Sequence, residues 1–159
     1  ANDVFGPYKG TGNDNEWGER FADIITRIMN ADFTVIPETY DRAANLEYAG
    51  GISTLSHDGA DRFWMGLRAA FPNAEFKIHH QIGRNDPDMP PRAALRWTLH
   101  GKHEGWGSFG TPTGAEVFIL GASHAEFGAV IGGQPKLRRE WTLFDETAVW
   151  KQIILKTGG

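Results

Sequence analysis

The sequence predicts an α+β protein, in which helices occupy the first part of the chain and strands follow one another in the second. Three observations support this class. Apolar residues recur at helical spacing from Glu16 to Ile28 and again around Trp64. After Pro72 the apolar spacing changes to two, and four such segments succeed one another. Helices and strands that are segregated in this way are typical of α+β folds rather than of alternating βαβ units.

The expected helices follow from periodicity and from residues that favour helix ends. The first is expected to begin at Glu16, where the periodic pattern starts. A short second helix is expected over 37–42, because its first residue is a proline, which is favoured in a first turn. A third is expected over 57–72 with Asp58 as its N-cap, and a last helix over 146–156.

The expected strands are separated by segments rich in glycine and proline, which favour turns. An early strand is expected between the second and third helices, and the four others come after the third helix. The strands are expected over 44–51, 74–82, 93–106, 115–127 and 137–145.

Length and composition limit the class of protein. The chain has 159 residues, about the size of one domain, and we expect a flexible arm over 1–15 followed by one domain over 16–159. A net charge of −4 with dispersed basic residues argues against a nucleic-acid partner. No apolar run approaches the length of a membrane span, and the absence of cysteine excludes disulfides. We expect a cytoplasmic protein.

The stretch REWTLFDETAVWKQI, residues 139–153, raises a question about Asp145. Strand alternation places this carboxylate on one face with Trp141 and Leu143. Asp145 either caps the helix that follows or lines an apolar cavity, where burial would raise its pKa and suit it to acid–base chemistry. From the residues alone, the helix cap is the preferred interpretation.

Four motifs in order resemble those of a known family: LRAAFP, ALRWTLHGKHEG, FGTPTGAEV and PKLRREW followed by Asp145. The chain resembles the SnoaL-like polyketide (ester) cyclases, and the match covers residues 44–145. The resemblance implies the nuclear-transport-factor-2-like fold, a cone-shaped curved antiparallel sheet that N-terminal helices close around a deep apolar pocket. Lys102 and the TPTG segment depart from the family pattern.

The resemblance also implies a function. Family cyclases close a ring by intramolecular aldol condensation, without a metal or an organic cofactor, and their acid/base aspartate matches Asp145. We therefore expect a cofactor-independent cyclase or lyase acting on a polyketide-like, carbonyl-rich small molecule, and a homodimer formed through the open sheet face. The alternatives are a non-catalytic binding or accessory protein of the same fold, and an epoxide-hydrolase-like enzyme using Arg96 and Asp145.

Further site residues are expected beside Asp145, which the resemblance makes the preferred catalytic residue. His124 is expected to hold the substrate or to tune the aspartate. No metal site is expected, because the sequence lacks an HExxH motif and the adjacent His79 and His80 should point to opposite faces of a strand. The expected substrate-binding residues are Trp141, Leu143, Arg96, Trp97, Phe118, Trp64 and Tyr48.

Overall fold

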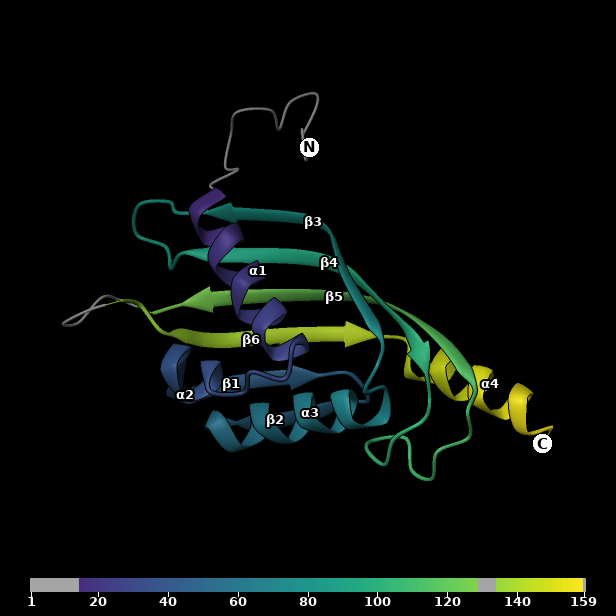
Figure 1. The fold of residues 1–159 in the computed structure, drawn as a ribbon. Coiled ribbons are helices and arrows are strands. Elements are labelled where there is room, and N and C mark those ends of the chain that lie inside the picture. The colour runs from purple at the N-terminus through teal and green to yellow at the C-terminus, as the bar shows by residue number, and fades with distance from the viewer. Residues whose placement is uncertain (1–14, 129–133, 159) are drawn as a thin grey trace.

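The computed structural model describes residues 15–128 and 134–158 (Figure 1). The expected arm over 1–15 lies, apart from its last residue, outside the described residues, as does most of the loop after the fourth expected strand. The helices are α1 (Asn15–Met29), α2 (Val35–Thr39), α3 (Ser56–Ala70) and α4 (Glu146–Thr157). The strands are β1 (Tyr40–Tyr48), β2 (Ile52–Leu55), β3 (Glu75–Arg84), β4 (Arg92–Lys102), β5 (Glu116–Phe127) and β6 (Leu137–Phe144).

One curved sheet contains the six strands in the order β2-β1-β6-β5-β4-β3. Figure 1 shows β3, β4 and β5 bending near α4, and α1 lying across the sheet. The α+β class, with N-terminal helices closing a curved sheet, is confirmed. The sheet is mixed rather than purely antiparallel, because the early strand β1 runs parallel to the last strand β6.

Three boundaries differ from the prediction. The short helix α2 ends at Thr39, because the chain becomes extended at Tyr40 and begins β1 there. Strand β2 was not predicted, and it pairs antiparallel with β1. Helix α3 starts at Ser56, and no side chain caps it, so the expectation that Asp58 is its N-cap is wrong.

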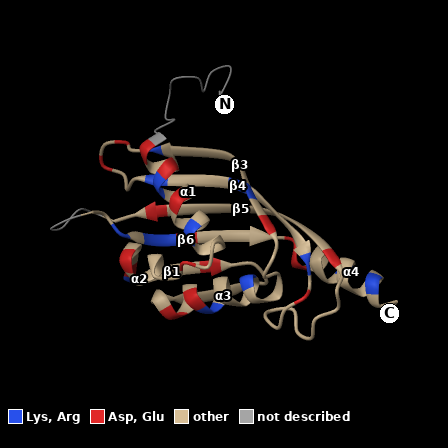
Figure 2. Ribbon diagram, viewed as in Figure 1, with Lys and Arg blue, Asp and Glu red and all other residues tan. Residues whose placement is uncertain are grey.

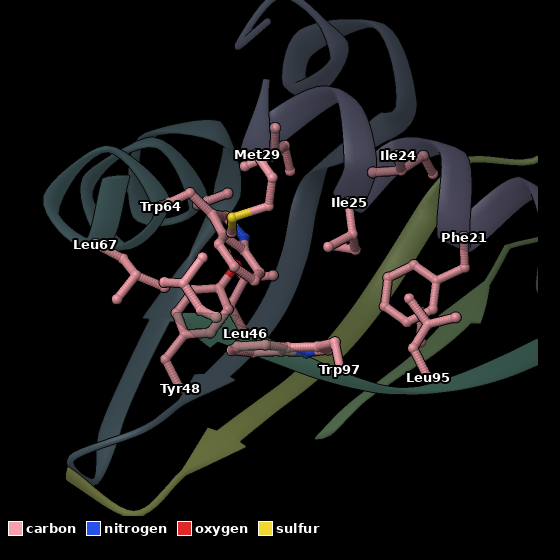
Figure 3. Close-up of a cluster of buried hydrophobic side chains, with 14 of the residues drawn as sticks. Phe21, Ile24, Ile25, Met29, Leu46, Tyr48, Trp64, Leu67, Leu95 and Trp97 are labelled. Atoms are coloured by element: carbon pink, nitrogen blue, oxygen red, sulfur yellow. The ribbon is translucent and has the colours of Figure 1, made fainter. Parts of the chain in front are cut away.

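The core lies between the sheet and the helices α1 and α3. Helix α1 packs on β3 and β4, and α3 packs on β1 and β2. Figure 3 shows Phe21 and Ile25 of α1 pointing toward the sheet, where Leu95 and Trp97 of β4 lie. A Cβ atom at Gly121 would stand 2.1 Å from the Trp97 ring, so only glycine leaves room for this indole on the sheet.

The two faces of the sheet have different surroundings. We call the face under α1 and α3 the inner face; it carries buried polar groups as well as apolar ones, Glu140 and Thr142 among them. The opposite face, here called the open face, carries Phe118, Leu120 and Leu143, whose side chains are 48%, 63% and 54% exposed. Apolar residues therefore occupy both faces of the sheet.

Charged residues lie mostly on the helices and near the ends of strands (Figure 2). In the described part of the chain, no helix has both the length and the apolar content needed to cross a membrane.

A bulge in β3 changes the direction of two histidines. The pairing register with β4 shifts between Ile78 and His80. His79 bonds the Thr98 hydroxyl at 2.8 Å, and His80 pairs with Arg96, so both histidines lie on the open face. The expectation that they point to opposite faces is wrong, because a bulge interrupts strand alternation.

Candidate functional site

Asp145 is the N-cap of α4. Its Oδ1 accepts a hydrogen bond from the Ala148 amide at 3.0 Å, and the residue is exposed. Leu143 and Trp141 lie on the open face, and Glu140 and Thr142 are buried on the inner face. The expected apolar pocket around Asp145 is therefore wrong, since β6 turns the other set of alternating side chains toward the core.

The open face collects part of the predicted site. A depression of about 610 Å³ is lined by apolar side chains and by polar ones, His79 and Thr98 among them. His124 lies nearby, half-buried and stacked on Trp141 with ring centroids 5.1 Å apart. Burial lowers the pKa of His124. The predicted residues that line the depression are Arg96, Phe118 and Leu143.

The remaining predicted residues, Trp64, Trp97 and Tyr48, lie on the inner side of the sheet, around a carboxyl group that the sequence did not single out. Glu140 is completely buried there. Its Oε1 accepts hydrogen bonds from the phenol of Tyr40 at 2.5 Å and from that of Tyr48 at 2.8 Å. The predicted site is thus divided between the two faces of the sheet, with Asp145 in neither group.

A chain of side-chain hydrogen bonds reaches the other oxygen of Glu140. The Thr142 hydroxyl donates to Oε2 at 2.6 Å, and Ser123 and Thr142 lie 2.8 Å apart. The Trp97 indole donates to Ser123 at 3.0 Å. Because an indole N–H only donates and Thr142 spends its hydrogen on the carboxylate, the Ser123 hydrogen must point to Thr142. The chain therefore runs in one direction and ends at Glu140.

The protonation of Glu140 reflects two opposing effects. Burial raises its pKa above the ordinary value of 4.5, and hydrogen bonds from Thr142, Tyr40 and Tyr48 oppose that rise. Trp64 also lowers this pKa, although its indole N–H makes no hydrogen bond of normal geometry. Burial, and then the charge of Glu140, raise the pKa of both tyrosines well above 10.0, so their phenols remain neutral donors.

Four strands supply the residues that are hydrogen-bonded around Glu140, here called the cluster. Strand β1 provides both tyrosines, β6 provides Glu140 and Thr142, and β5 and β4 provide one residue each. The register places Thr142 beside Tyr48 on one side and beside Ser123 on the other. Glu140, Thr142 and Ser123 were not predicted as site residues. The available signal was the even spacing of Tyr40 and Tyr48, and of Glu140 and Thr142, which places each pair on one face of its strand.

Aromatic rings lie between this cluster and solvent. Tyr48 stacks on Phe63 with centroids 4.0 Å apart and an interplanar angle of 5°. The ring centroid of Phe144 lies 6.3 Å from that of Phe63 and 6.5 Å from that of Trp97. Phe63 and Phe144 are half-buried, whereas Tyr48 and Trp97 are buried. The half-buried rings of Phe63 and Phe144 thus pack against the buried rings of Tyr48 and Trp97.

These features suit acid–base chemistry. A carboxyl group whose pKa is raised by burial is better suited both to take and to return a proton than one at its ordinary pKa. Among residues 15–128 and 134–158, no three His, Asp or Glu side chains converge as a metal would require.

The helices packed on a curved six-stranded sheet define the nuclear-transport-factor-2-like fold. No family model and no curated protein sequence matches this chain. Among solved structures, the chain is similar to a protein from Jannaschia sp. CCS1 that is provisionally assigned as a SnoaL-like polyketide cyclase. The TM-score is 0.65 at 14% identity, over 95% of this chain and 96% of that one.

Two Streptomyces proteins are also similar. IdmH of Streptomyces antibioticus, provisionally assigned as a polyketide cyclase, matches with a TM-score of 0.62 at 18% identity, over 83% of this chain and 96% of that one. AclR of Streptomyces galilaeus, provisionally assigned as a hydroxylase, matches with a TM-score of 0.67 at 17% identity, over 87% and 85% of the two chains. At these identities the comparisons establish the fold.

Proposed function

We propose that this chain is a cofactor-independent enzyme of the cyclase type, which acts on a polyketide-like, carbonyl-rich small molecule with Glu140 as its acid/base. One observation carries the proposal. Glu140 is a fully buried carboxyl group on the inner face, with a raised pKa and two phenols on one oxygen. Perturbed carboxyl groups of this kind are enriched at functional sites.

The chemistry requires one group that first accepts and then returns a proton. As a base, Glu140 takes a proton from the carbon next to a carbonyl. The resulting enolate attacks a second carbonyl of the same molecule, and a carbon–carbon bond forms. The protonated Glu140 then gives its proton to the new alkoxide, so the carboxylate is regenerated. The phenols of Tyr40 and Tyr48 supply neutral donors that stabilise the negative charge near the carboxyl group.

The test begins with a ligand screen. Aromatic polyketides and hydroxyquinones are ranked by the rise in melting temperature that they cause. Glu140→Gln is then compared with the unmodified protein on every compound that is turned over. Gln keeps the shape of the side chain but cannot exchange a proton, so turnover should fall by roughly 10²–10⁴-fold while binding survives. Full turnover by this variant contradicts the proposal.

A non-catalytic small-molecule binding protein is the second candidate. It is favoured by the complete enclosure of Glu140 and by the hydroxyl hydrogen bonds to both of its oxygens, which suit a structural group. Fold alone does not decide between binding and catalysis. Compounds that stabilise the protein in the screen but are never converted would favour this candidate.

We also propose that two copies pair through the open face. Phe118, Leu120 and Leu143 together expose apolar side chains on neighbouring strands. Contiguous apolar surface of this kind marks interaction sites in soluble proteins. The fold leaves this face without a covering helix from α1 or α3, which pack on the other side.

A further inference from the structure

The two oxygens of Glu140 differ in what they can reach. Oε2 is approached through Thr142 and Ser123, and that chain ends at the Trp97 indole. An indole N–H does not accept a proton, so the chain leads to no proton acceptor and no substrate. A ligand must therefore reach the carboxyl group from the side of Oε1, where the two phenols lie.

The two phenols are not equivalent. Both tyrosines are buried to the same extent, and the backbone carbonyl of Tyr40 is bonded by the His57 ring of α3 at 2.7 Å. Tyr48 has its ring face against Phe63, and Phe63 is half-buried. Tyr48 thus joins a half-buried ring to the carboxyl group, because its ring stacks on Phe63 and its hydroxyl donates to Glu140.

We propose that Phe63 occupies a ligand slot: a flat, conjugated ring stacks on Tyr48 in the place that the Phe63 ring holds in this structure. The near-parallel geometry of the Tyr48–Phe63 pair, 4.0 Å and 5°, is the geometry that a planar ligand would adopt on the same phenol. Trp64 makes an edge-to-face pair with each of these rings. Its ring centroid lies 6.1 Å from that of Tyr48 and 4.9 Å from that of Phe63. The role of this slot rests on the proposed function. Its geometry indicates the class of ligand, a planar conjugated ring.

The helix that carries Phe63 is fixed at both ends. Near its start the His57 ring bonds the carbonyl of Tyr40, and near its end the amides of Ser108 and Gly105 bond the carbonyls of Gly66 and Ala70 at 3.1 and 3.2 Å. Entry of a ligand therefore requires rotation of the Phe63 side chain and not displacement of α3. A side-chain rotation is a fast event, so the slot is available without unfolding.

The binding experiment uses 1,8-dihydroxyanthraquinone, a planar conjugated probe, titrated by quenching of tryptophan fluorescence. Removing the Phe63 ring leaves a preformed apolar cavity, and such cavities bind aromatic molecules. Phe63→Ala and the milder Phe63→Leu should each bind the probe more tightly than the unmodified protein, by about tenfold or more for Phe63→Ala. Adding Tyr48→Leu to Phe63→Ala should remove the gain in affinity for the probe.

Phe76→Ala is the matched control. Phe76 is also half-buried in the aromatic cluster and contacts Trp97 at 5.6 Å, but it makes no stacked pair with Tyr48. Its loss should leave the affinity unchanged. The slot is refuted if the Phe63 variants, shown to be folded by near-ultraviolet circular dichroism, gain no affinity, or if Phe76→Ala gains as much.

A second measurement uses the unmodified protein. The aromatic proton signals of Phe63 are followed by NMR as the probe is added, because the stacked Tyr48 ring shifts them in the empty protein. They should move toward ordinary values when the probe saturates the slot. Saturation that leaves them unchanged overturns the inference. Neither measurement needs turnover, so an active Glu140→Gln variant would refute the proposed acid/base and leave the slot standing.

Discussion

Tyr48 donates its phenolic hydrogen to Glu140 at 2.8 Å, although 92 positions separate the two residues in the chain. The contact depends on the parallel pairing of β1 with β6, which aligns Tyr48 with Thr142 and Leu46 with Glu140. The topology of the sheet therefore creates the carboxyl environment on which the proposed function rests.

The role of Asp145 is tested by stability. As an N-cap it accepts the Ala148 amide, so Asp145→Ala should lower the free energy of unfolding by about 1 kcal/mol. Asp145→Asn should change it little, since Asn caps helices about as well as Asp. Urea unfolding of both variants measures the two values. Equal stability of all three proteins contradicts the capping role.

The sequence predicted where helices and strands lie better than it predicted which face of a strand is buried. Periodicity identified α1, α3, α4 and the strands β3 to β6, because each buries one stripe or one alternating set of side chains. It did not predict β2, a four-residue strand whose side chains show no alternating burial. It also did not predict the pairing of β1 with β6, whose contacts join residues far apart in the chain. These non-local contacts leave no local pattern.

The direction of β6 could not be predicted for a different reason. In LRREWTLF, Trp141 and Leu143 form one alternating set, and Glu140 and Thr142 belong to the other. Hydrophobicity favours burying the first set, yet the structure buries the second, because the tyrosine partners of Glu140 lie on β1, the Ser123 partner of Thr142 lies on β5, and the open face is itself apolar.

Thr142→Val tests the chain of hydroxyl groups. Valine keeps the shape but leaves the Ser123 hydrogen and one oxygen of Glu140 without their partner, so the free energy of unfolding should fall by roughly 1–3 kcal/mol. Thr98→Val is the control, because Thr98 bonds the exposed His79 and should change stability by less than about 0.5 kcal/mol. Equal effects of the two substitutions would show that the buried chain contributes nothing specific.

The raised pKa of Glu140 predicts a pH dependence of stability with a definite sign. As pH rises past 4.5, the carboxyl group ionises first in the unfolded chain, which stabilises the unfolded state. Stability from this group should therefore be greatest below that pH and decline until pH exceeds the pKa in the folded protein. Glu140→Gln has no ionisable group at this position, so its stability does not decline for this reason. The free energy of unfolding of the unmodified protein, relative to that of the variant, should therefore fall from pH 4 to 8. A relative stability that rises with pH would mean a lowered pKa.

Leu120→Glu tests pairing through the open face. Leu120 is 63% exposed, so the charge should cost the folded chain little, but it should dissociate a dimer whose interface is apolar. Leu155→Glu is the control, since Leu155 is 73% exposed on α4 and not on the open face. Sedimentation should give a dimer for the control and a monomer for Leu120→Glu. If both variants are dimers, the interface lies elsewhere on the protein.

We propose that the acid/base is the buried Glu140 and not the helix-capping Asp145. The most direct test of this proposal is the turnover number of Glu140→Gln beside that of Asp145→Asn, measured on the same accepted substrate with both variants shown to be folded. We expect a fall of roughly 10²–10⁴-fold for Glu140→Gln and an unchanged value for Asp145→Asn. A large fall for Asp145→Asn together with full turnover by Glu140→Gln would contradict it.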